Sequence, residues 1–367
     1  MTEDAAELQR RARELLPRDV YDYYAGGAGR ERTLRGNQKA WRRTWLAPRV
    51  LRDVSAVDTA VAVLGTALAT PVCVAPTAYH GLASPAGELA TAAGAARAGA
   101  LFVLSTRCSR PIEEVADVLA AEGGSWWFQV YVLRDRNLTA SLVRRAAAAG
   151  AGALVLTADT PVVGRKRRNS ADGVVTDEEF LVNLGPLGDL SAADQAADVL
   201  FTDIGWLAEI SGLPVIVKGV LRPDDALACA AAGAAGVIVS NHGGRQLDGA
   251  VPTALALPGV AAALQEQPGG CEVYADGGIR TGDDVLAGLA LGAGAVFVGR
   301  PVLWALAAGG ADGVQSLLTG LTGDLAHSMA LAGAATVPQI AGIGPHRWSC
   351  GQAGIPWDGE SCPKSPP

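Results

Sequence analysis

The hydrophobic pattern of the chain consists of short β-branched runs that recur between alanine- and glycine-rich stretches of helical length. This alternation is typical of parallel strands joined by crossover helices. The small residues of the intervening stretches allow helices to lie close to a sheet. The eight expected strands are residues 71–76, 101–106, 126–132, 153–159, 214–219, 236–242, 272–277 and 295–300.

Each of these runs is apolar first and polar or glycine-containing last. Barrel enzymes place their chemistry at the C-terminal ends of their strands, so eight polar ends would meet at one mouth. An open doubly wound sheet is the alternative, but a GxGxxG fingerprint after the first strand is missing. We therefore predict an α/β fold of the (β/α)8 TIM barrel type. The polar end residues are Thr77, Ser105, Gln129, Tyr131, Thr157, Asp159, Lys218, Ser240, His242, Asp276 and Arg300.

Two further segments flank the predicted barrel, and a long loop interrupts it. We expect residues 1–55 to form an N-terminal helical extension that contributes to the active site, and residues 56–340 to form the barrel. The segment at about 166–204 has no clear period and contains several glycines. Such a segment is typical of a lid loop or a disordered excursion. The Gly/Pro-rich residues 341–367 are expected to be a poorly ordered tail.

The composition limits the classes of partner. With 367 residues, of which 49% are hydrophobic, the chain is long enough to bury a large core. Its 30 basic and 37 acidic residues give a net charge of −7, and no long basic block is present, which argues against a nucleic-acid partner. The one dense basic run, residues 165–168, is either a solvated loop, a nucleic-acid patch, or, because it follows a strand, part of a substrate site or lid.

The N-terminal residues and the cysteines bear on location. The first residues are acidic, and no apolar run approaches the ~18 residues that a membrane span needs. We therefore expect a cytoplasmic protein with no membrane partner. The six cysteines are scattered without CxxC pairing, so neither a metal site nor a disulfide framework is indicated. A Cys350–Cys362 pair in the tail is not expected in a reducing compartment.

The segment 239–248 carries the most informative chemistry. It places His242 and Arg245 three residues apart, with two glycines between them, directly after an apolar strand. The glycines allow a tight turn, so that His242 as proton acceptor and Arg245 as carboxylate anchor face one small substrate. This pairing suggests a 2-hydroxy or 2-amino acid. The alternative is that a polar pair follows a strand because loops are polar.

The last two strands suggest a phosphate site. Barrels often bind phosphate with the loops after strands seven and eight, and residues 276–280 and 299–300 supply glycines and arginines there. A phosphate-bearing cofactor follows from this pattern, although a turn would also explain a glycine pair. Lys218, at the end of the fifth strand, is a structural lysine, a Schiff-base lysine or a positive charge beside a cofactor ring.

Several further motifs accompany residues 239–248. They are Tyr23–Tyr24 with Gly26, and residues 47–51, 75–78, 87–88, 128–131, 157–161, 218–219, 276–278 and 299–301. With these motifs, the chain from about Tyr21 to about Gly342 resembles the FMN-dependent 2-hydroxy-acid oxidases and dehydrogenases, the family of glycolate oxidase, lactate oxidase and mandelate dehydrogenase. Within that family the likeness is nearest to bacterial 4-hydroxymandelate oxidases, through residues 78–79, 243–252 and 299–308.

The resemblance implies FMN as the cofactor. Lys218 would lie near the flavin N1 and C2 carbonyl, where it stabilises the anionic reduced flavin. The implied FMN-binding residues are Pro76, Thr77, Ala78, Ser105, Gln129, Thr157, Lys218, Ser240, Asp276, Gly277, Gly278, Arg280, Gly299 and Arg300.

The resemblance also implies the reaction, oxidation of a 2-hydroxy acid to the 2-oxo acid. His242 would take the hydroxyl or Cα proton, and Asp159 would orient the imidazole of His242. Arg245 would hold the carboxylate of the substrate. Tyr23 and Tyr131 would hydrogen-bond the substrate. The electron acceptor is O2, giving hydrogen peroxide, or another carrier. The family further implies a homo-oligomer, a tetramer.

Two residues depart from the family pattern. Lys166 stands where a second arginine usually completes the grip on the carboxylate, and lysine lacks the planar fork. Arg107 stands where an aromatic or apolar residue is usual; it either suits a second acidic group on the substrate or points to solvent. Tyr79, at the barrel mouth, suits an aryl ring, so mandelate or 4-hydroxymandelate is the expected substrate. The alternatives are a related flavoenzyme redirected to a natural-product intermediate and a non-catalytic flavin-binding protein.

Overall fold

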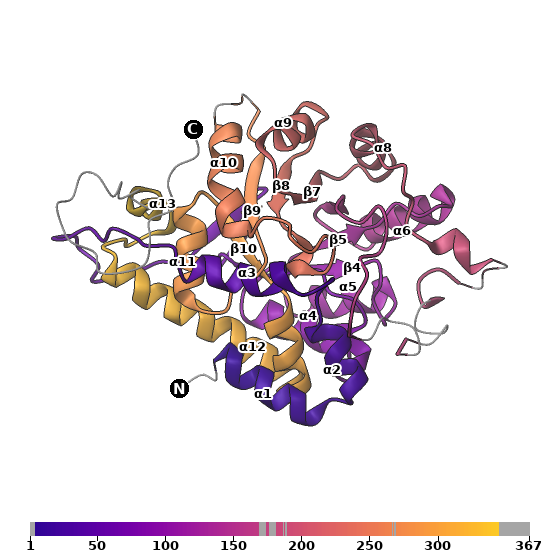
Figure 1. Ribbon diagram of the computed structural model, residues 1–367, viewed down its shortest axis with the longest axis horizontal. Helices are drawn as coiled ribbons and strands as arrows, with labels where there is room; N and C mark the ends of the chain where they lie inside the picture. The colour runs from indigo at the N-terminus through magenta and orange to yellow at the C-terminus, as the bar shows by residue number, and fades with distance from the viewer. Residues whose placement is uncertain are drawn as a thin grey trace.

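Eight parallel strands close into a barrel, in the order β10-β3-β4-β5-β6-β7-β8-β9, and helices surround it (Figure 1). The computed structural model describes residues 4–168, 174–175, 181–185, 187, 189–265, 267 and 269–344. All eight predicted strands are confirmed, and the predicted polar end residues lie in the C-terminal halves of these strands or in the residues just beyond them. The barrel strands are β3 (Val72–Val74), β4 (Phe102–Ser105), β5 (Trp126–Val130), β6 (Leu154–Thr157), β7 (Val215–Val220), β8 (Gly236–Val239), β9 (Glu272–Ala275) and β10 (Ala295–Val298).

Helices follow the strands as the alternating pattern predicts. The helix that follows the last barrel strand, α12, changes direction at Gly309 and Gly310, whose backbone is not helical. Short 3-10 turns, which fall mainly in the loops around the barrel, are η1 (His80–Leu82), η2 (Leu190–Ala193), η3 (His242–Gly244) and η4 (Ala341–Ile343). The helices after the first barrel strand are α4 (Glu88–Arg97), α5 (Ile112–Ala121), α6 (Arg136–Ala148), α8 (Thr202–Ser211), α9 (Pro223–Ala231), α10 (Thr253–Gln265), α11 (Gly282–Ala290), α12 (Arg300–Leu331) and α13 (Val337–Ile340).

The interior of the barrel is a packed core. The rings of Trp127, Tyr274 and Phe297 pack against one another, with centroids 5.7 to 6.0 Å apart. Below them lies a hairpin that the sequence analysis missed, formed by β1 (Val61–Val63) and β2 (Thr66–Leu68). The backbone N–H of Leu64 donates to Glu272 at the start of β9, so the hairpin covers the N-terminal end of the barrel. The opposite, C-terminal end is left for the site.

The N-terminal extension contains three helices, α1 (Ala5–Leu15), α2 (Arg18–Ala25) and α3 (Arg32–Trp41). The Asp248 carboxylate, in the loop after β8, accepts hydrogen bonds from three backbone N–H groups at the start of α3. The buried side chains of Asn37 and Asn241 also donate to each other, at 2.8 and 2.7 Å. These contacts bind the extension to the loop that carries His242. Beyond Trp41 the extension is irregular rather than helical, and Pro48 within it lacks the backbone donor that a further helical turn would use.

The remaining sequence expectations on organisation stay predictions. The predicted loop at about 166–204 is described only in part, and the predicted tail from residue 345 onward, with Cys350 and Cys362, lies outside the described residues. The boundaries at residues 55 and 340 are likewise untested. Over the part of the chain that the structure describes, no helix has both the length and the hydropathy needed to cross a bilayer.

Candidate active site

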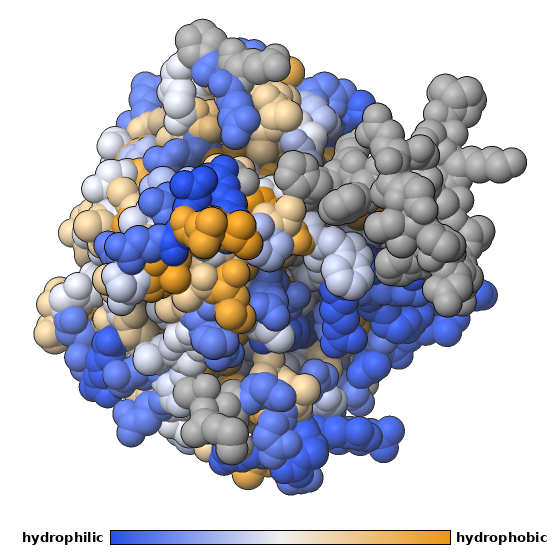
Figure 2. All heavy atoms as spheres, turned by 90° about the vertical axis from the view of Figure 1, so that its left-hand side faces the viewer, coloured by the Kyte–Doolittle hydropathy of each residue, from blue (hydrophilic) through white to orange (hydrophobic). Residues whose placement is uncertain are grey.

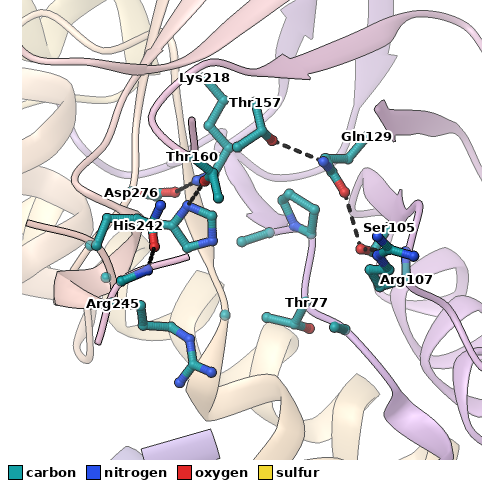
Figure 3. A pocket seen from close by; sticks show the side chains of 18 of the residues that line it. Thr77, Ser105, Arg107, Gln129, Thr157, Thr160, Lys218, His242, Arg245 and Asp276 are labelled. Atoms are coloured by element: carbon teal, nitrogen blue, oxygen red, sulfur yellow. Dashed lines mark hydrogen bonds and ion pairs between the residues drawn. The ribbon is translucent and has the colours of Figure 1, made fainter. Parts of the chain in front are cut away.

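A cavity of about 790 Å³ opens at the C-terminal ends of the barrel strands (Figure 3). The structure brings almost all of the predicted site residues into its wall. Two others, Asp159 and Ser240, lie directly behind the wall, where each contacts His242. The predicted residues that line the cavity are Tyr23, Pro76, Thr77, Ala78, Tyr79, Ser105, Arg107, Gln129, Tyr131, Thr157, Lys166, Lys218, His242, Arg245, Asp276, Gly277, Gly278, Arg280, Gly299 and Arg300.

His242 is held from both its backbone and its ring. Its φ of 57° is in the left-handed region, which histidine enters rarely, and the Ser240 hydroxyl accepts its backbone N–H at 3.0 Å. The ring Nδ1 lies 2.9 Å from the Asp159 carboxylate, which comes from the loop after β6. The Thr160 hydroxyl donates to the same carboxylate oxygen at 3.2 Å. With Nδ1 engaged by Asp159, Nε2 is the ring nitrogen that remains for the cavity.

The charges and burial of this pair leave His242 able to act as a base. Burial lowers the pKa of His242 from its ordinary 6.5, although the neighbouring Asp159 opposes the shift. Burial alone would raise the pKa of Asp159, but the charge and hydrogen bond of His242 and the charge of Lys218 outweigh it and lower that pKa to about 2. At neutral pH the imidazole is therefore neutral and its partner is a carboxylate, which is the state in which His242 accepts a proton.

Arg245 is anchored to the N-terminal extension. Its Nη1 donates to the backbone carbonyls of Tyr23 and Gly26, at 2.8 and 2.9 Å. Its guanidinium carbon lies 5.2 Å from the centre of the Tyr23 ring, and the Lys166 Nζ lies 5.5 Å from the same ring. These distances are typical of cation–π contacts. The ring of Tyr23 is thus in contact with two cations of the cavity wall.

Both tyrosines of the site keep their protons. Burial raises the pKa of the Tyr23 phenol, and the charges of Arg245 and Arg107 only partly counteract it. Burial, together with the charge of Asp159, also raises the pKa of Tyr131. Because a protonated phenol donates a hydrogen bond, Tyr23 and Tyr131 are available as donors to a polar ligand.

A row of hydrogen-bonded polar side chains lies across the C-terminal ends of the strands, at the bottom of the cavity. The Gln129 amide carbonyl accepts from Ser105 Oγ at 3.0 Å, and its amide nitrogen donates to Thr157 Oγ1 at 3.0 Å. The buried Lys218 Nζ donates to Ser240 Oγ at 3.0 Å and lies 3.4 Å from the Asp276 carboxylate. The other Asp276 oxygen is buried and has no hydrogen-bond partner among the described residues. These groups suit a flat, polar-edged ring.

The far end of the cavity suits an anion. Arg300 donates to the carbonyls of Tyr24, Gly243 and Gly26, and burial, reinforced by the nearby charges of Arg245 and Arg280, lowers its pKa. Burial also lowers the pKa of Arg280, to about 10. Two arginines that share one buried space favour a doubly charged anion between them. A phosphate satisfies both, so the residues present fit FMN.

Several residues of the site escaped the sequence analysis. Gln246 donates to the carbonyls of Asp159 and Val162 and accepts from the Gly164 N–H, which fastens the loop after β6 to the loop after β8. Its position next to Arg245 was a signal for this role. Gln195 also lines the cavity. Since Gln195 belongs to no motif, only the fold reveals it.

Gly219 offers a test of the geometry around Asp159. It lies at a bulge in β7 with φ of 109°, and a Cβ added there would be 2.6 Å from the Asp159 Cβ. We expect Gly219→Ala to displace Asp159 and to lower kcat/KM about tenfold to a hundredfold. Gly233→Ala is the matched control, because its φ is 92° but nothing lies within 4 Å of the added Cβ. Equal losses in the two variants would mean that backbone strain, and not the collision, limits activity.

A closed barrel with a His–Asp pair, an arginine-lined anion end and a buried lysine fits an oxidoreductase with a phosphate-bearing flavin cofactor. The family model described as FMN-dependent dehydrogenase matches residues 12–343. The chain belongs to this family, and its cofactor is FMN.

Among characterised relatives, the chain is 44% identical to a 4-hydroxymandelate oxidase from Amycolatopsis orientalis, covering 90% of this chain and 95% of the relative. It is 43% identical to an L-lactate oxidase from a Nostoc strain, over 91% of this chain and 95% of that one. A crystal structure of mandelate oxidase superimposes with a TM-score of 0.85 at 44% identity, covering 92% of this chain and 96% of the other. The predicted family and fold are thereby confirmed.

Proposed function

We propose that this protein oxidises the α-carbon of a 2-hydroxy acid to the 2-oxo acid, with O2 as the electron acceptor and hydrogen peroxide as the second product. The observation that carries the proposal is the 2.9 Å contact between His242 and Asp159 at the wall of a cavity that also holds Arg245. A neutral base beside a carboxylate anchor is what such a substrate requires. The relatives named as oxidases support O2 as the acceptor.

Each residue has a separate task in this proposal. His242 accepts the hydroxyl or Cα proton through Nε2, and Asp159 stabilises the imidazolium that results. Arg245, fixed by its carbonyl contacts, pairs with the substrate carboxylate. Tyr23 and Tyr131 donate hydrogen bonds to the substrate oxygens. When bound, FMN supplies the two-electron acceptor for the α-carbon.

The cofactor contacts are part of the same proposal. The flavin ring would be held by the backbone at 76–78, by Lys218 and by the polar side chains around Gln129. The phosphate would be held by Arg280, Arg300 and the glycines of the last two strand loops. The positive φ angles of Gly277 and Gly278, 87° and 97°, support close approach of backbone N–H groups to that phosphate.

An aromatic acid, such as mandelate or 4-hydroxymandelate, is the proposed substrate type. The similarity to enzymes named for these acids supports it. The buried Tyr79 and the side chains of Val162, Val163 and Leu303 add an apolar wall to the cavity. The experiment is a panel of 2-hydroxy acids assayed for O2 uptake and for the 2-oxo acid. If no acid of the panel is turned over, the proposed function is wrong.

The rate should depend on pH through His242. Because burial lowers its pKa below 6.5, the imidazole stays neutral down to mildly acidic pH. We expect kcat/KM to fall as pH drops through this lowered pKa, since a protonated ring accepts no proton. Asp159→Asn should move this acid limb to still lower pH, because the carboxylate favours the imidazolium. A pH profile that is the same in both proteins would contradict the assignment.

We also propose a homo-oligomer, a tetramer by analogy with the family. Val50, Leu51 and Leu331 are 70% or more exposed, and the Arg49 N–H donates to the Ala332 carbonyl, which places these side chains near one another. Figure 2 shows apolar side chains gathered on the face where α12 ends. Such a patch favours a second copy. The native mass in solution, and its change in Leu51→Asp, test this proposal.

A cytoplasmic location is proposed as well. The four cysteines of the described residues are free thiols, as a reducing compartment requires. Cell fractionation tests it.

A further inference from the structure

Arg107 lies inside the cavity rather than in solvent. It follows β4, and its Nη2 donates to the Ala193 carbonyl in η2 at 2.6 Å. Its backbone N–H donates to Ser105 Oγ at 3.1 Å. Figure 3 shows Arg107 and Arg245 on opposite sides of the cavity. Of the two alternatives left by the sequence, the solvent-facing one is wrong.

The two tyrosines of the site lie within range of both guanidinium groups. Burial raises the pKa of Tyr23 and of Tyr131, and the charges of Arg107 and Arg245 both oppose that shift for each phenol. Arg107 therefore acts on the space in which the substrate must lie. If Arg245 holds the carboxylate next to the reacting carbon, Arg107 faces the other end of the molecule.

The surroundings of Arg107 favour a charged ligand group. Next to Ala193, which Arg107 contacts, the loop continues to Gln195, which lines the cavity with a buried side-chain carbonyl that lacks a hydrogen-bond partner among the described residues. The described wall of the cavity carries eight basic and two acidic side chains, in a chain with a net charge of −7. Two of the basic groups, Arg280 and Arg300, fall at the phosphate end. The concentration of positive charge attracts and orients anions.

We propose that Arg107, together with the Gln195 amide, forms a distal subsite for a second carboxylate on the substrate. This inference rests on the proposed function and refines its substrate class. It predicts that 2-hydroxy acids with a carboxylate at each end are better substrates than mandelate or 4-hydroxymandelate. Arg107 is then a specificity-determining residue. A planar guanidinium binds a carboxylate through two parallel hydrogen bonds, which gives the site direction as well as charge. As the structure stands, Gln195 presents its carbonyl, an acceptor, so its amide must turn the NH2 toward the carboxylate in order to donate to it.

The test compares substrates that differ only in the distal group. One pair is 2-hydroxyglutarate and 2-hydroxypentanoate, and the other is 4-carboxymandelate and 4-methylmandelate. In the pair that the holoenzyme turns over faster, we expect kcat/KM for the diacid to exceed that for the monocarboxylic acid about tenfold or more. In Arg107→Met this ratio should fall about tenfold to a hundredfold, as loss of a charge-assisted hydrogen bond predicts. Arg107→Lys should keep part of the preference for the diacid, because lysine retains the positive charge.

The matched control is Arg110→Met, the same change three residues along the same loop but outside the cavity wall. It should leave the ratio unchanged. Retained flavin absorption and thermal stability show whether each variant is folded. Equal losses on both members of a pair would mean that Arg107 is only structural and would overturn the subsite.

Two other outcomes separate the subsite from the reaction. 4-Hydroxymandelate is assayed beside these pairs, and a preference for it over 4-carboxymandelate would mean that Arg107 and Gln195 bind a phenol. The subsite for a carboxylate would then be wrong while the proposed function stands. The same holds if the monocarboxylic acids are oxidised and neither diacid is preferred. If no acid of either pair is oxidised, the proposed function fails, and the subsite fails with it.

Discussion

His242→Asn is expected to be a folded, yellow protein that no 2-hydroxy acid reduces. Asparagine is the best replacement because it tolerates the left-handed backbone at this position, where φ is 57°. Its amide does not accept a proton at neutral pH, so the rate of flavin reduction should fall at least ~10²–10⁴-fold, the usual contribution of a general base. Stopped-flow absorbance under anaerobic conditions measures this rate directly.

Two controls make the His242 result interpretable. His327→Asn makes the same change at an exposed residue outside the described cavity wall and should leave the reduction rate as it is. Binding of a 2-oxo acid product, followed by the change in the flavin spectrum, should be nearly unchanged in His242→Asn because Arg245 remains. Reduction at the normal rate in this variant would remove His242 from the mechanism.

Lys218→Met is expected to destabilise the protein and to weaken its binding of FMN. The Lys218 ammonium is 5% exposed and lies 3.4 Å from the Asp276 carboxylate, which is 7% exposed. Removing one member of a buried ion pair leaves the other charge uncompensated, at a cost of about 3–5 kcal/mol in the free energy of unfolding. Denaturant unfolding measures this loss, and the flavin-to-protein absorbance ratio measures retention of FMN.

The double variant Lys218→Met/Asp276→Asn separates the two effects. Because the amide carries no charge, this variant should recover much of the stability. It should not recover flavin reduction, since the cation that we propose beside the flavin ring is still missing. A double variant as impaired in stability as Lys218→Met alone would mean that the pair contributes through packing and not through charge.

The sequence predicted the barrel because each strand had the same polarity along the chain. A buried strand such as Leu154–Thr157 must be apolar on both faces, and its last residue meets the cavity. The order of apolar and polar residues therefore shows where the strand lies and in which direction it runs. The same rule placed His242 and Asp159 at strand ends that meet at the cavity, but their pairing was implied only by the family resemblance. The hairpin of β1 and β2 was missed, because two three-residue strands leave almost no periodic signal.

Other parts of the site depend on contacts that no local pattern encodes. The backbone N–H of His242 is bonded to Ser240, and the neighbouring Asn241 is fixed by Asn37, 204 residues away along the chain. Arg245 was predicted as a carboxylate anchor, but its carbonyl contacts with the extension come from packing. The direction of Arg107 was undecided for the same reason, since it depends on the Ala193 carbonyl of a distant loop.

The most direct test of the account is the visible spectrum of the purified protein, recorded without oxygen before and after addition of 2-hydroxy acids. The panel contains mandelate and the two diacids, 4-carboxymandelate and 2-hydroxyglutarate. We predict an oxidised flavin spectrum that bleaches with at least one of these acids and returns when air is admitted. A colourless protein that FMN does not reconstitute, or a yellow one that none of the acids bleaches, would contradict it.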